Sequence, residues 1–257
     1  MIIKKLLNKI EINKYTLILL FLSLITGLFK EIEVIFIILL FHELGHFIAA
    51  KFLKWNVKKI IFYPFGGLTI FEEKIDKPLK EEFFITIMGP VFQIITYIVC
   101  KYMYEKYLLS EYTFSLIKNY HYGILLFNLL PIVPLDGSKL LNIFLNKFIN
   151  FRKSFTSTIY ISIIVLIIGL FYVYNDASYY ILILFLIYQI FINIKNKNFI
   201  YQRFILEKGL YPTEYSKYKK VKDVKNMYRN KKHLIYKNNM YITEKKMFNN
   251  ISNKKWI

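Results

Sequence analysis

The stretch that decides the fold of this 257-residue chain reads Ile38-Leu39-Leu40-Phe41-His42-Glu43-Leu44-Gly45-His46-Phe47-Ile48-Ala49-Ala50. It places the pattern H-E-x-x-H inside an apolar run, Ile32–Leu53. A helix of that length can cross the hydrocarbon core of a bilayer, which is about 30 Å thick. His42 follows Ile32 by ten residues, which is about 15 Å along a helix and near the bilayer centre. An ionisable side chain there costs about 2.5–3.5 kcal/mol on insertion scales, so the cluster indicates a functional site.

The spacing of the two histidines is typical of a metal site. On a helix, His42 and His46 lie on one face, so both imidazoles can reach a single ion. Glu43 is adjacent and is placed to contact a water on the metal, whose pKa zinc lowers towards about 7. The chain has 4 His and 13 Glu, so the pattern is expected by chance only roughly 0.003 times. The alternative is that the three side chains only form hydrogen bonds to neighbouring helices.

A third protein ligand is needed, because catalytic zinc usually binds three protein groups and keeps one open position. Asp136 is the best candidate, in the segment Asn128-Leu129-Leu130-Pro131-Ile132-Val133-Pro134-Leu135-Asp136-Gly137. Its prolines and glycine predict a break or kink, which membranes tolerate where the backbone faces protein or a wet cavity. Asn128 could hold a carbonyl of an extended substrate or orient a ligand. His121, at the mouth of an apolar stretch, and His233, in the basic tail, are weaker candidates.

The composition excludes a simple water-soluble enzyme. Hydrophobic residues make up 56% of the chain and the mean hydropathy is +0.36, whereas soluble domains have about 45–50% apolar residues. We predict an all-α polytopic membrane protein with about six transmembrane helices in residues 1–195. The six apolar stretches are Tyr15–Phe29, Ile32–Leu53, Phe83–Tyr104, Tyr122–Phe148, Thr158–Tyr174 and Tyr179–Ile194. The single Cys100 rules out an intrachain disulfide and a thiolate zinc cluster.

The distribution of basic residues predicts the orientation in the membrane. Lys and Arg number 4 before the first stretch, 7 between Lys51 and Lys80, 3 in the fourth loop and 17 in the tail, against 1, 3 and 0 in the remaining loops. The basic side is cytoplasmic, so both termini are expected there. In the loop after the second stretch, apolar runs flank Pro64 and Gly66-Gly67. They predict a membrane-associated hairpin, the alternative being an irregular loop with an apolar patch.

The basic tail could suggest a nucleic-acid partner, but its position argues against one. From Lys195 onward the chain has 17 basic and 4 acidic residues, which is +13 of a net charge of +19. This charge adjoins a membrane span, where it is attracted to anionic lipid at about 1 kcal/mol per Lys. We therefore predict no nucleic-acid partner. Residues 199–257 form either a small folded module or a basic tail drawn to the bilayer.

Together these motifs resemble the site-2 protease family of intramembrane zinc metalloproteases. Gly66-Gly67 and Met88-Gly89-Pro90 fit the same pattern. The resemblance implies that His42, His46 and Asp136 bind one zinc ion, that Glu43 is the general base, and that Asn128 and Pro134 shape substrate binding. Two residues depart from the family pattern: Gln93 stands where many members have Asn, and Ser138 where a second Gly is common.

The six stretches, the early H-E-x-x-H and the absence of a PDZ insertion are most similar to a sporulation branch of this family. That resemblance implies a membrane-associated protein substrate, a sigma-factor precursor whose pro-sequence is removed, in the mother-cell membrane around the forespore. It also implies membrane inhibitor proteins, a homo-oligomer, and an ATP-sensing CBS module in the C-terminal segment. The short strands and helix start of that module would be Lys222–Val224, Leu234–Tyr236 and Tyr241–Glu244. An anti-sigma factor or signal-peptide remnants are the alternative substrates.

Two rival functions are weighed against proteolysis. Some metal transporters also place such ligands in helices, but they are expected to show broken helices in two repeated halves. This chain has one His pair, and its last two apolar stretches carry almost no ionisable groups. A catalytically inactive scaffold is the second rival. The presence of His42, Glu43, His46 and Asp136 argues against it.

Overall fold

The computed structural model describes residues 10–63, 66–172, 178–211, 215–216, 218–237, 240–244 and 246–247. The chain divides into two compact units. The first contains Met1–Glu73 and Phe83–Leu130, and the second contains Lys74–Glu82 and Pro131–Ile257. A short segment between the first hairpin and most of the next helix therefore belongs to the second unit.

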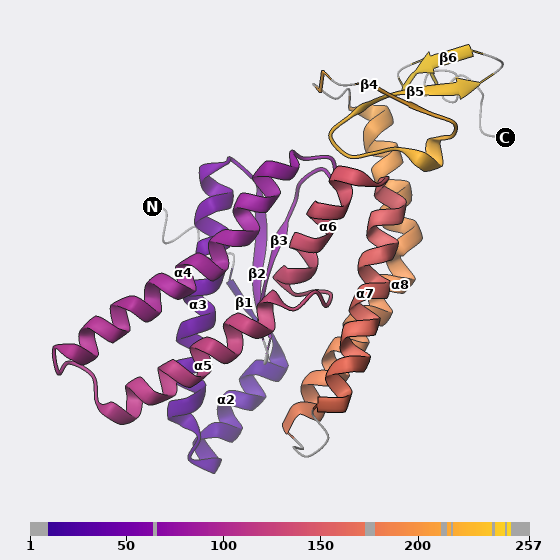
Figure 1. The fold of residues 1–257 in the computed structure, drawn as a ribbon. Helices are drawn as coiled ribbons and strands as arrows, with labels where there is room; N and C mark the ends of the chain where they lie inside the picture. Colours follow the sequence, from indigo (N-terminus) through magenta and orange to yellow (C-terminus); the bar gives the residue numbers. More distant parts are fainter. Residues whose placement is uncertain are drawn as a thin grey trace. The chain divides into compact units, whose positions relative to one another are not determined.

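The first unit packs helices around a small sheet (Figure 1). Its helices are α2 (Lys14–Thr26), α3 (Phe29–Phe52), α4 (Leu79–Glu105), whose first residues belong to the second unit, and α5 (Glu111–Leu129). Its strands are β1 (Ile10–Ile12), β2 (Val57–Tyr63) and β3 (Gly66–Phe71). Strand β1 is parallel to β2, and β2 is antiparallel to β3.

The hairpin predicted after the second apolar stretch is confirmed as β2 and β3, joined between Tyr63 and Gly66. Residues 64 and 65, which the hairpin prediction includes, lie outside the described residues. The hairpin stays against α3 because its apolar side chains share one core with that helix. This core consists of Leu39, Phe47, Ala49, Ala50, Trp55, Val57, Ile60 and Ile85. Strand β1 was not predicted, since three residues are too few to show a period.

The described residues of the second unit form three α-helices and a second sheet. The helices are α6 (Asp136–Phe148), α7 (Phe151–Tyr172) and α8 (Ser178–Leu210). They are followed by β4 (Tyr218–Val221), a 3-10 turn at Val224–Asn226, β5 (Lys232–Lys237) and β6 (Met240–Thr243). Strand β4 is parallel to β5, and β5 is antiparallel to β6. Leu234–Tyr236 lies in β5 as predicted. Lys222–Val224 is not a strand but leads into the 3-10 turn, and residues 241–243, predicted to start a helix, lie in β6. Nucleotide binding there stays a prediction.

The fourth apolar stretch, Tyr122–Phe148, is not one helix. Helix α5 ends at Leu129 and α6 begins at Asp136, so the predicted break falls at the two prolines. The irregular segment between them is held by Ser162 of α7. The Val133 N–H donates to Ser162 Oγ at 3.1 Å, and Ser162 Oγ donates to the Pro131 carbonyl oxygen at 3.1 Å. Backbone groups that no helix satisfies are thereby paired inside the unit.

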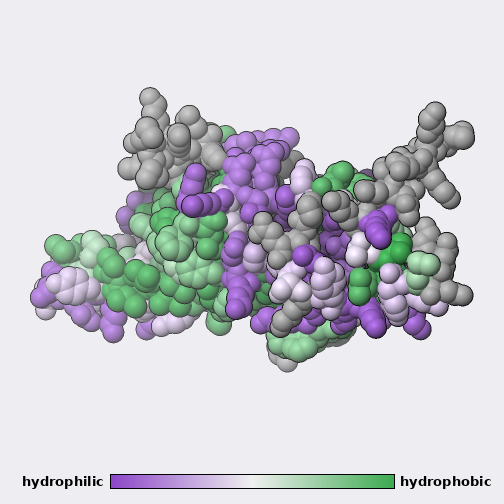
Figure 2. Space-filling model, turned by 90° about the horizontal axis from the view of Figure 1, so that it is seen from above, coloured by the Kyte–Doolittle hydropathy of each residue, from purple (hydrophilic) through white to green (hydrophobic). Residues whose placement is uncertain are grey.

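Four of the described helices are long and apolar enough to cross a membrane: α3, α4, α7 over Phe151–Phe171 and α8 over Tyr180–Leu210. Helix α2 has 13 residues, about 20 Å at about 1.5 Å per residue, which is less than the hydrocarbon thickness. The long helices expose large apolar side chains, as Figure 2 shows in green over the helices at the left of the view. This surface is that of a membrane protein, while six crossings are not established.

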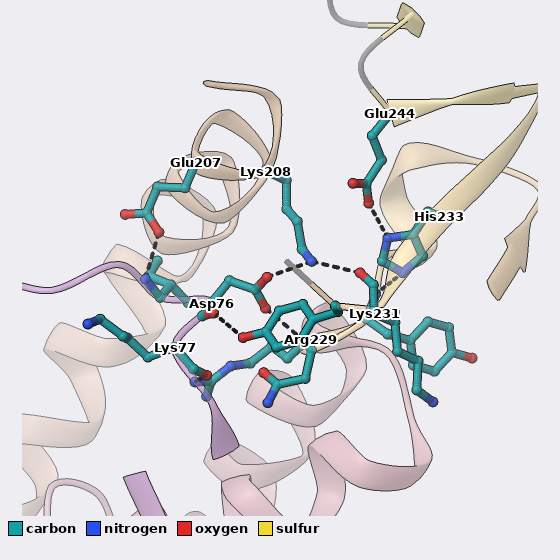
Figure 3. A network of polar contacts seen from close by, with 12 residues as sticks. Asp76, Lys77, Glu207, Lys208, Arg229, Lys231, His233 and Glu244 are labelled. Carbon is teal, nitrogen blue, oxygen red and sulfur yellow. Dashed lines mark hydrogen bonds and ion pairs between the residues drawn. The ribbon is translucent and has the colours of Figure 1, made fainter. Parts of the chain in front are cut away.

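The described part of the C-terminal segment, up to residue 247, is folded within the second unit. Its sheet packs on α7 and α8 through a buried cluster of Phe151, Phe204, Val221, Met227 and Ile235. Lys208, whose Nζ lies 5.8 Å from the centroid of the Phe204 ring, belongs to a polar network (Figure 3). In that network Lys208 Nζ is 2.6 Å from Asp76 Oδ2, with side-chain exposures of 0% and 7%. The Lys208 ammonium also donates to the Lys231 carbonyl oxygen at 2.8 Å.

A second ion pair extends this network towards the start of α4. Arg229 Nη2 lies 2.6 Å from Glu82 Oε2, and the Asn230 N–H donates to Asp76 Oδ1 at 2.9 Å. The segment Lys74–Glu82 is thus held by residues near the C-terminal end of the chain. We call the pairs Lys208–Asp76 and Arg229–Glu82 the clamp.

Candidate metal centre

The two histidines of the motif lie together on the buried face of α3. His42 and His46 are 2% and 4% exposed, and their Nε2 atoms are 3.2 Å apart. The ring centroids are 4.9 Å apart with the planes nearly perpendicular. The expected juxtaposition of the two imidazoles is therefore present in the structure.

Neighbouring groups decide which nitrogen of each ring carries the proton. The Gln93 amide nitrogen donates to the His121 carbonyl oxygen at 2.9 Å, so its amide oxygen faces His42 Nδ1 at 3.0 Å. His46 Nδ1 lies 2.8 Å from the Ile85 carbonyl oxygen. Both partners of Nδ1 can only accept a hydrogen bond. Each Nδ1 is therefore protonated, and each Nε2 offers its lone pair.

This arrangement fits a zinc ion. A metal-ligating histidine almost always donates its other N–H to a carbonyl or carboxylate, as both rings do here. Zn–N bonds of about 2.0–2.1 Å at a tetrahedral angle place two ligand nitrogens about 3.3 Å apart. The observed separation of 3.2 Å is close to that value.

Two glycines allow α4 to approach the histidines. A Cβ on Gly89 would overlap Nε2 of His46, and a Cβ on Gly45 would overlap the Met88 carbonyl oxygen. The close contact of α3 and α4 brings Gln93 and the Ile85 carbonyl within reach of the rings. The structure thus explains why position 89 is a glycine: a larger residue would overlap the His46 ring.

Glu43 is buried, at 5% exposed, and is held by the hairpin. Thr69 of β3 donates from Oγ1 to Glu43 Oε2 at 2.6 Å. A Cβ on Gly67 would overlap the Glu43 side chain. Neither Thr69 nor the contact with Gly67 was predicted. The only signal in the sequence was a hydroxyl between the apolar residues Leu68 and Ile70.

Asp136 is the first residue of α6 and is buried, at 4% exposed. The positive end of the helix dipole favours a carboxylate at this position. Lys139 Nζ lies 2.8 Å from Asp136 Oδ1. His42, His46 and Asp136 are all buried, and each offers one ligand atom that could bind a metal ion. Two imidazoles and one carboxylate form a donor set that zinc accepts.

The remaining candidates occupy varied positions. Asn128 is half-buried near the end of α5, a helix that packs on α3, and Pro134 is half-buried in the segment before α6. His121 is buried and stacks on Tyr97, with ring centroids 4.4 Å apart. His233 contacts Glu244 through Nδ1 at 2.5 Å and accepts the Tyr228 N–H through Nε2 at 2.8 Å. Both ring nitrogens of His233 are thus used within the C-terminal sheet.

The fold and the H-E-x-x-H centre define a class, and comparison with known proteins agrees: the chain belongs to the site-2 protease family, peptidase family M50. The sequence model of peptidase family M50 matches residues 31–122. Stage IV sporulation protein FB of Bacillus subtilis is 35% identical over 207 residues, which cover 79% of this chain and 72% of that protein.

Two further comparisons, one of sequence and one of structure, support the same assignment. A zinc metalloprotease of Methanocaldococcus jannaschii is 33% identical over 127 residues, which cover 47% of this chain and 35% of that protein. The solved site-2 protease from Methanocaldococcus jannaschii superimposes with a TM-score of 0.54 at 26% identity. The match covers 73% of this chain and 90% of that one. The protein is accordingly a zinc metalloprotease, and the transporter and scaffold alternatives fall away.

Proposed function

We propose that the protein is an intramembrane endopeptidase in which His42, His46 and Asp136 hold one zinc ion and Glu43 is the general base. The observation that carries the proposal is the pair of Nε2 atoms 3.2 Å apart, each on a ring whose Nδ1 faces an acceptor. When bound, zinc would polarise the scissile carbonyl and stabilise the developing oxyanion.

Glu43 is suited to move the proton. Its carboxylate takes a proton from the attacking water and later returns it to the leaving amine, as general acid–base catalysis requires. Burial inside the first unit excludes bulk water from the carboxylate. One of its oxygens accepts the Thr69 hydroxyl, and the second oxygen remains to exchange the proton.

The substrate is proposed to be bound in an extended conformation beside β3. In the sheet order β1-β2-β3, strand β3 lies at the edge of the described sheet, and its residue Thr69 contacts Glu43. An edge strand offers backbone N–H and C=O groups to an added strand. A segment paired there would pass close to the general base. Asn128 and Pro134 are proposed to contact the same substrate near the metal.

The proposal includes the orientation and the substrate class. We propose six membrane crossings with both termini in the cytoplasm, as the basic residues predict. The relative from Bacillus subtilis is named for sporulation. This similarity supports a sigma-factor precursor in the mother-cell membrane as the substrate, with an anti-sigma factor or signal-peptide remnants as the second candidates.

The test is Glu43→Gln in protein co-expressed with each of these three substrate types. The amide is nearly isosteric but cannot take a proton, so cleavage should fall at least 10²–10⁴-fold. Zinc content of the purified protein should stay at the wild-type level. Glu33→Gln, which alters an exposed carboxylate of the same helix, is the control and should cleave normally. Near wild-type cleavage by the Glu43 variant would overturn the proposed role.

A further inference from the structure

We propose that Thr69 is a positioning residue for the reaction, because its hydroxyl holds Glu43 in the orientation that the general base requires. The inference rests on the proposed function of Glu43. It makes the hairpin β2–β3 part of the proton-transfer machinery, in addition to its place beside the substrate.

The hydrogen bond has the properties of a strong one. Thr69 Oγ1 and Glu43 Oε2 are 2.6 Å apart, and both residues are buried. Hydrogen bonds from a hydroxyl to a carboxylate at 2.5–2.7 Å are about twice as strong as neutral ones. The two residues are 26 positions apart in the chain. The bond therefore joins two separate elements, α3 and β3.

The position of Thr69 is itself rigid. It pairs with Ile60 in the ladder between β2 and β3, and Ile60 is part of the core shared with α3. Two residues before it, on the same face of the strand, Gly67 packs against the Glu43 side chain so closely that no Cβ would fit. The strand thus contacts Glu43 through a steric surface and a directed hydrogen bond.

These two contacts select one working oxygen. The hydroxyl hydrogen of Thr69 points at Oε2, so that oxygen has a donor and Oε1 is left to take the proton of the attacking water. Without the hydroxyl, the Glu43 carboxylate could rotate about its Cγ–Cδ bond, and Oε1 would no longer be oriented towards the attacking water. Positioning errors of about 1 Å cost about 10²-fold in well-oriented reactions.

The inference has a consequence for substrate binding. A substrate that adds to the edge of β3 would pair with the strand whose Thr69 already holds Glu43. Docking would then bring the scissile bond to a base that is aligned beforehand. A purely structural Thr69, present only to pair a buried carboxylate, would show no such link to turnover.

The experiment compares Thr69→Val, which is isosteric but lacks the hydroxyl, with Thr69→Ser, which keeps it. The assay uses the substrate that is cleaved best in the co-expression panel, with purified protein in vesicles. Thr69→Val should lower kcat about 10- to 100-fold, as expected for loss of a hydrogen bond to a charged group. KM should change less than about twofold, and zinc content should be normal. Thr69→Ser should retain kcat within about threefold.

Thr96→Val is the matched control, because Thr96 donates only to the Phe92 carbonyl oxygen within α4. It should leave kcat and zinc content unchanged. A Thr69→Val enzyme with wild-type kcat would overturn the inference. A Thr69→Val enzyme that loses zinc in proportion to its activity would also overturn it, since the effect would then be structural.

A second measurement needs no activity. Hydrogen exchange of the amides in 66–71 should quicken in Thr69→Val and in Glu43→Ala, and the double variant should exchange no faster than Glu43→Ala alone, because that substitution already removes the bond to Thr69 together with the packing against Gly67. Additive effects would contradict the proposed contact. Glu43→Gln separates the two hypotheses: if it cleaves normally, the proposed function fails, whereas if it is inactive while Thr69→Val is fully active, only the present inference fails.

Discussion

The two three-stranded sheets of the molecule are paired alike but differ in what they present. In each, the first strand runs parallel to the second and the second antiparallel to the third. The sheet β1-β2-β3 presents a glycine and a threonine to one buried carboxylate. The sheet β4-β5-β6 presents lysines and tyrosines on its outer face. Pairing alone therefore does not determine what a small sheet does.

The outer face of the second sheet is built from cation–aromatic pairs. Lys232 Nζ lies 5.7 Å from the Tyr218 ring and Lys220 Nζ lies 5.1 Å from the Tyr241 ring. The opposite face packs on Phe151 and Phe204. The second sheet is anchored by this apolar cluster, beside which the clamp holds Lys74–Glu82, whereas the first sheet is anchored by the core shared with α3. Substitutions in or beside each sheet test this difference separately.

The largest effect is expected from Gly67→Ala. The added methyl would overlap the Glu43 side chain, so the carboxylate or the strand must move. We expect cleavage to fall by at least about 10², as for displaced catalytic groups. Gly123→Ala is the control, because a Cβ at Gly123 meets nothing within 4 Å. Cleavage rates of the two variants measure how closely the first sheet must fit, and equal rates would contradict the steric argument.

Measurements of zinc content should distinguish the buried histidines of the proposed metal site from the buried His233 of the C-terminal sheet. His42→Ala and Asp136→Ala should each lower zinc content, because each removes one of three proposed ligands. His233→Ala should keep its zinc, because both ring nitrogens of His233 are engaged inside the C-terminal sheet. Metal content of protein purified in detergent is the measurement. Full occupancy in the Asp136 variant would place the third ligand elsewhere.

A smaller effect, on stability alone, is expected from the clamp. Lys208→Met leaves Asp76 buried without its ammonium partner, and breaking a buried pair in this way costs about 3–5 kcal/mol. Adding Asp76→Asn should recover part of this loss, because no unpaired charge then remains. Limited proteolysis of β4–β6 and denaturant unfolding report the change. If Lys208→Met is as stable as the double variant, the charge of Asp76 does not depend on Lys208 and the two residues are not energetically coupled.

The smallest effect is expected on the outer face of the second sheet. Lys220→Gln removes an exposed cation–aromatic contact, which is worth about 0.5–1 kcal/mol. Zinc content and cleavage should stay at wild-type levels, and only the melting temperature of the C-terminal sheet should fall slightly. Thermal unfolding of the variant provides the test, and a marked loss of cleavage would show that this face takes part in substrate handling.

Local patterns in the sequence predicted the features that depend on neighbouring residues. The spacing of His42 and His46 follows from the helix period, and the break before Asp136 follows from the two prolines. Contacts between distant segments were not predicted. Thr69 meets Glu43 across 26 residues, and Gln93 meets His42 across 51. Periodicity contains no information about which distant strand or helix will pack there. Six membrane spans likewise stay a prediction, because apolar length along the sequence does not show how α5 and α6 are held by tertiary contacts.

The clamp has a consequence for how this gene can change. Asp76 and Glu82 lie early in the chain, and their partners Lys208 and Arg229 lie near its end. A lineage that shortens its C-terminus would keep two acidic residues whose basic partners no longer exist. We therefore expect the acidic pair to be lost in the same branches that lose the C-terminal strands. Exchange of C-terminal modules between relatives should succeed only where positions 76 and 82 are transferred with them.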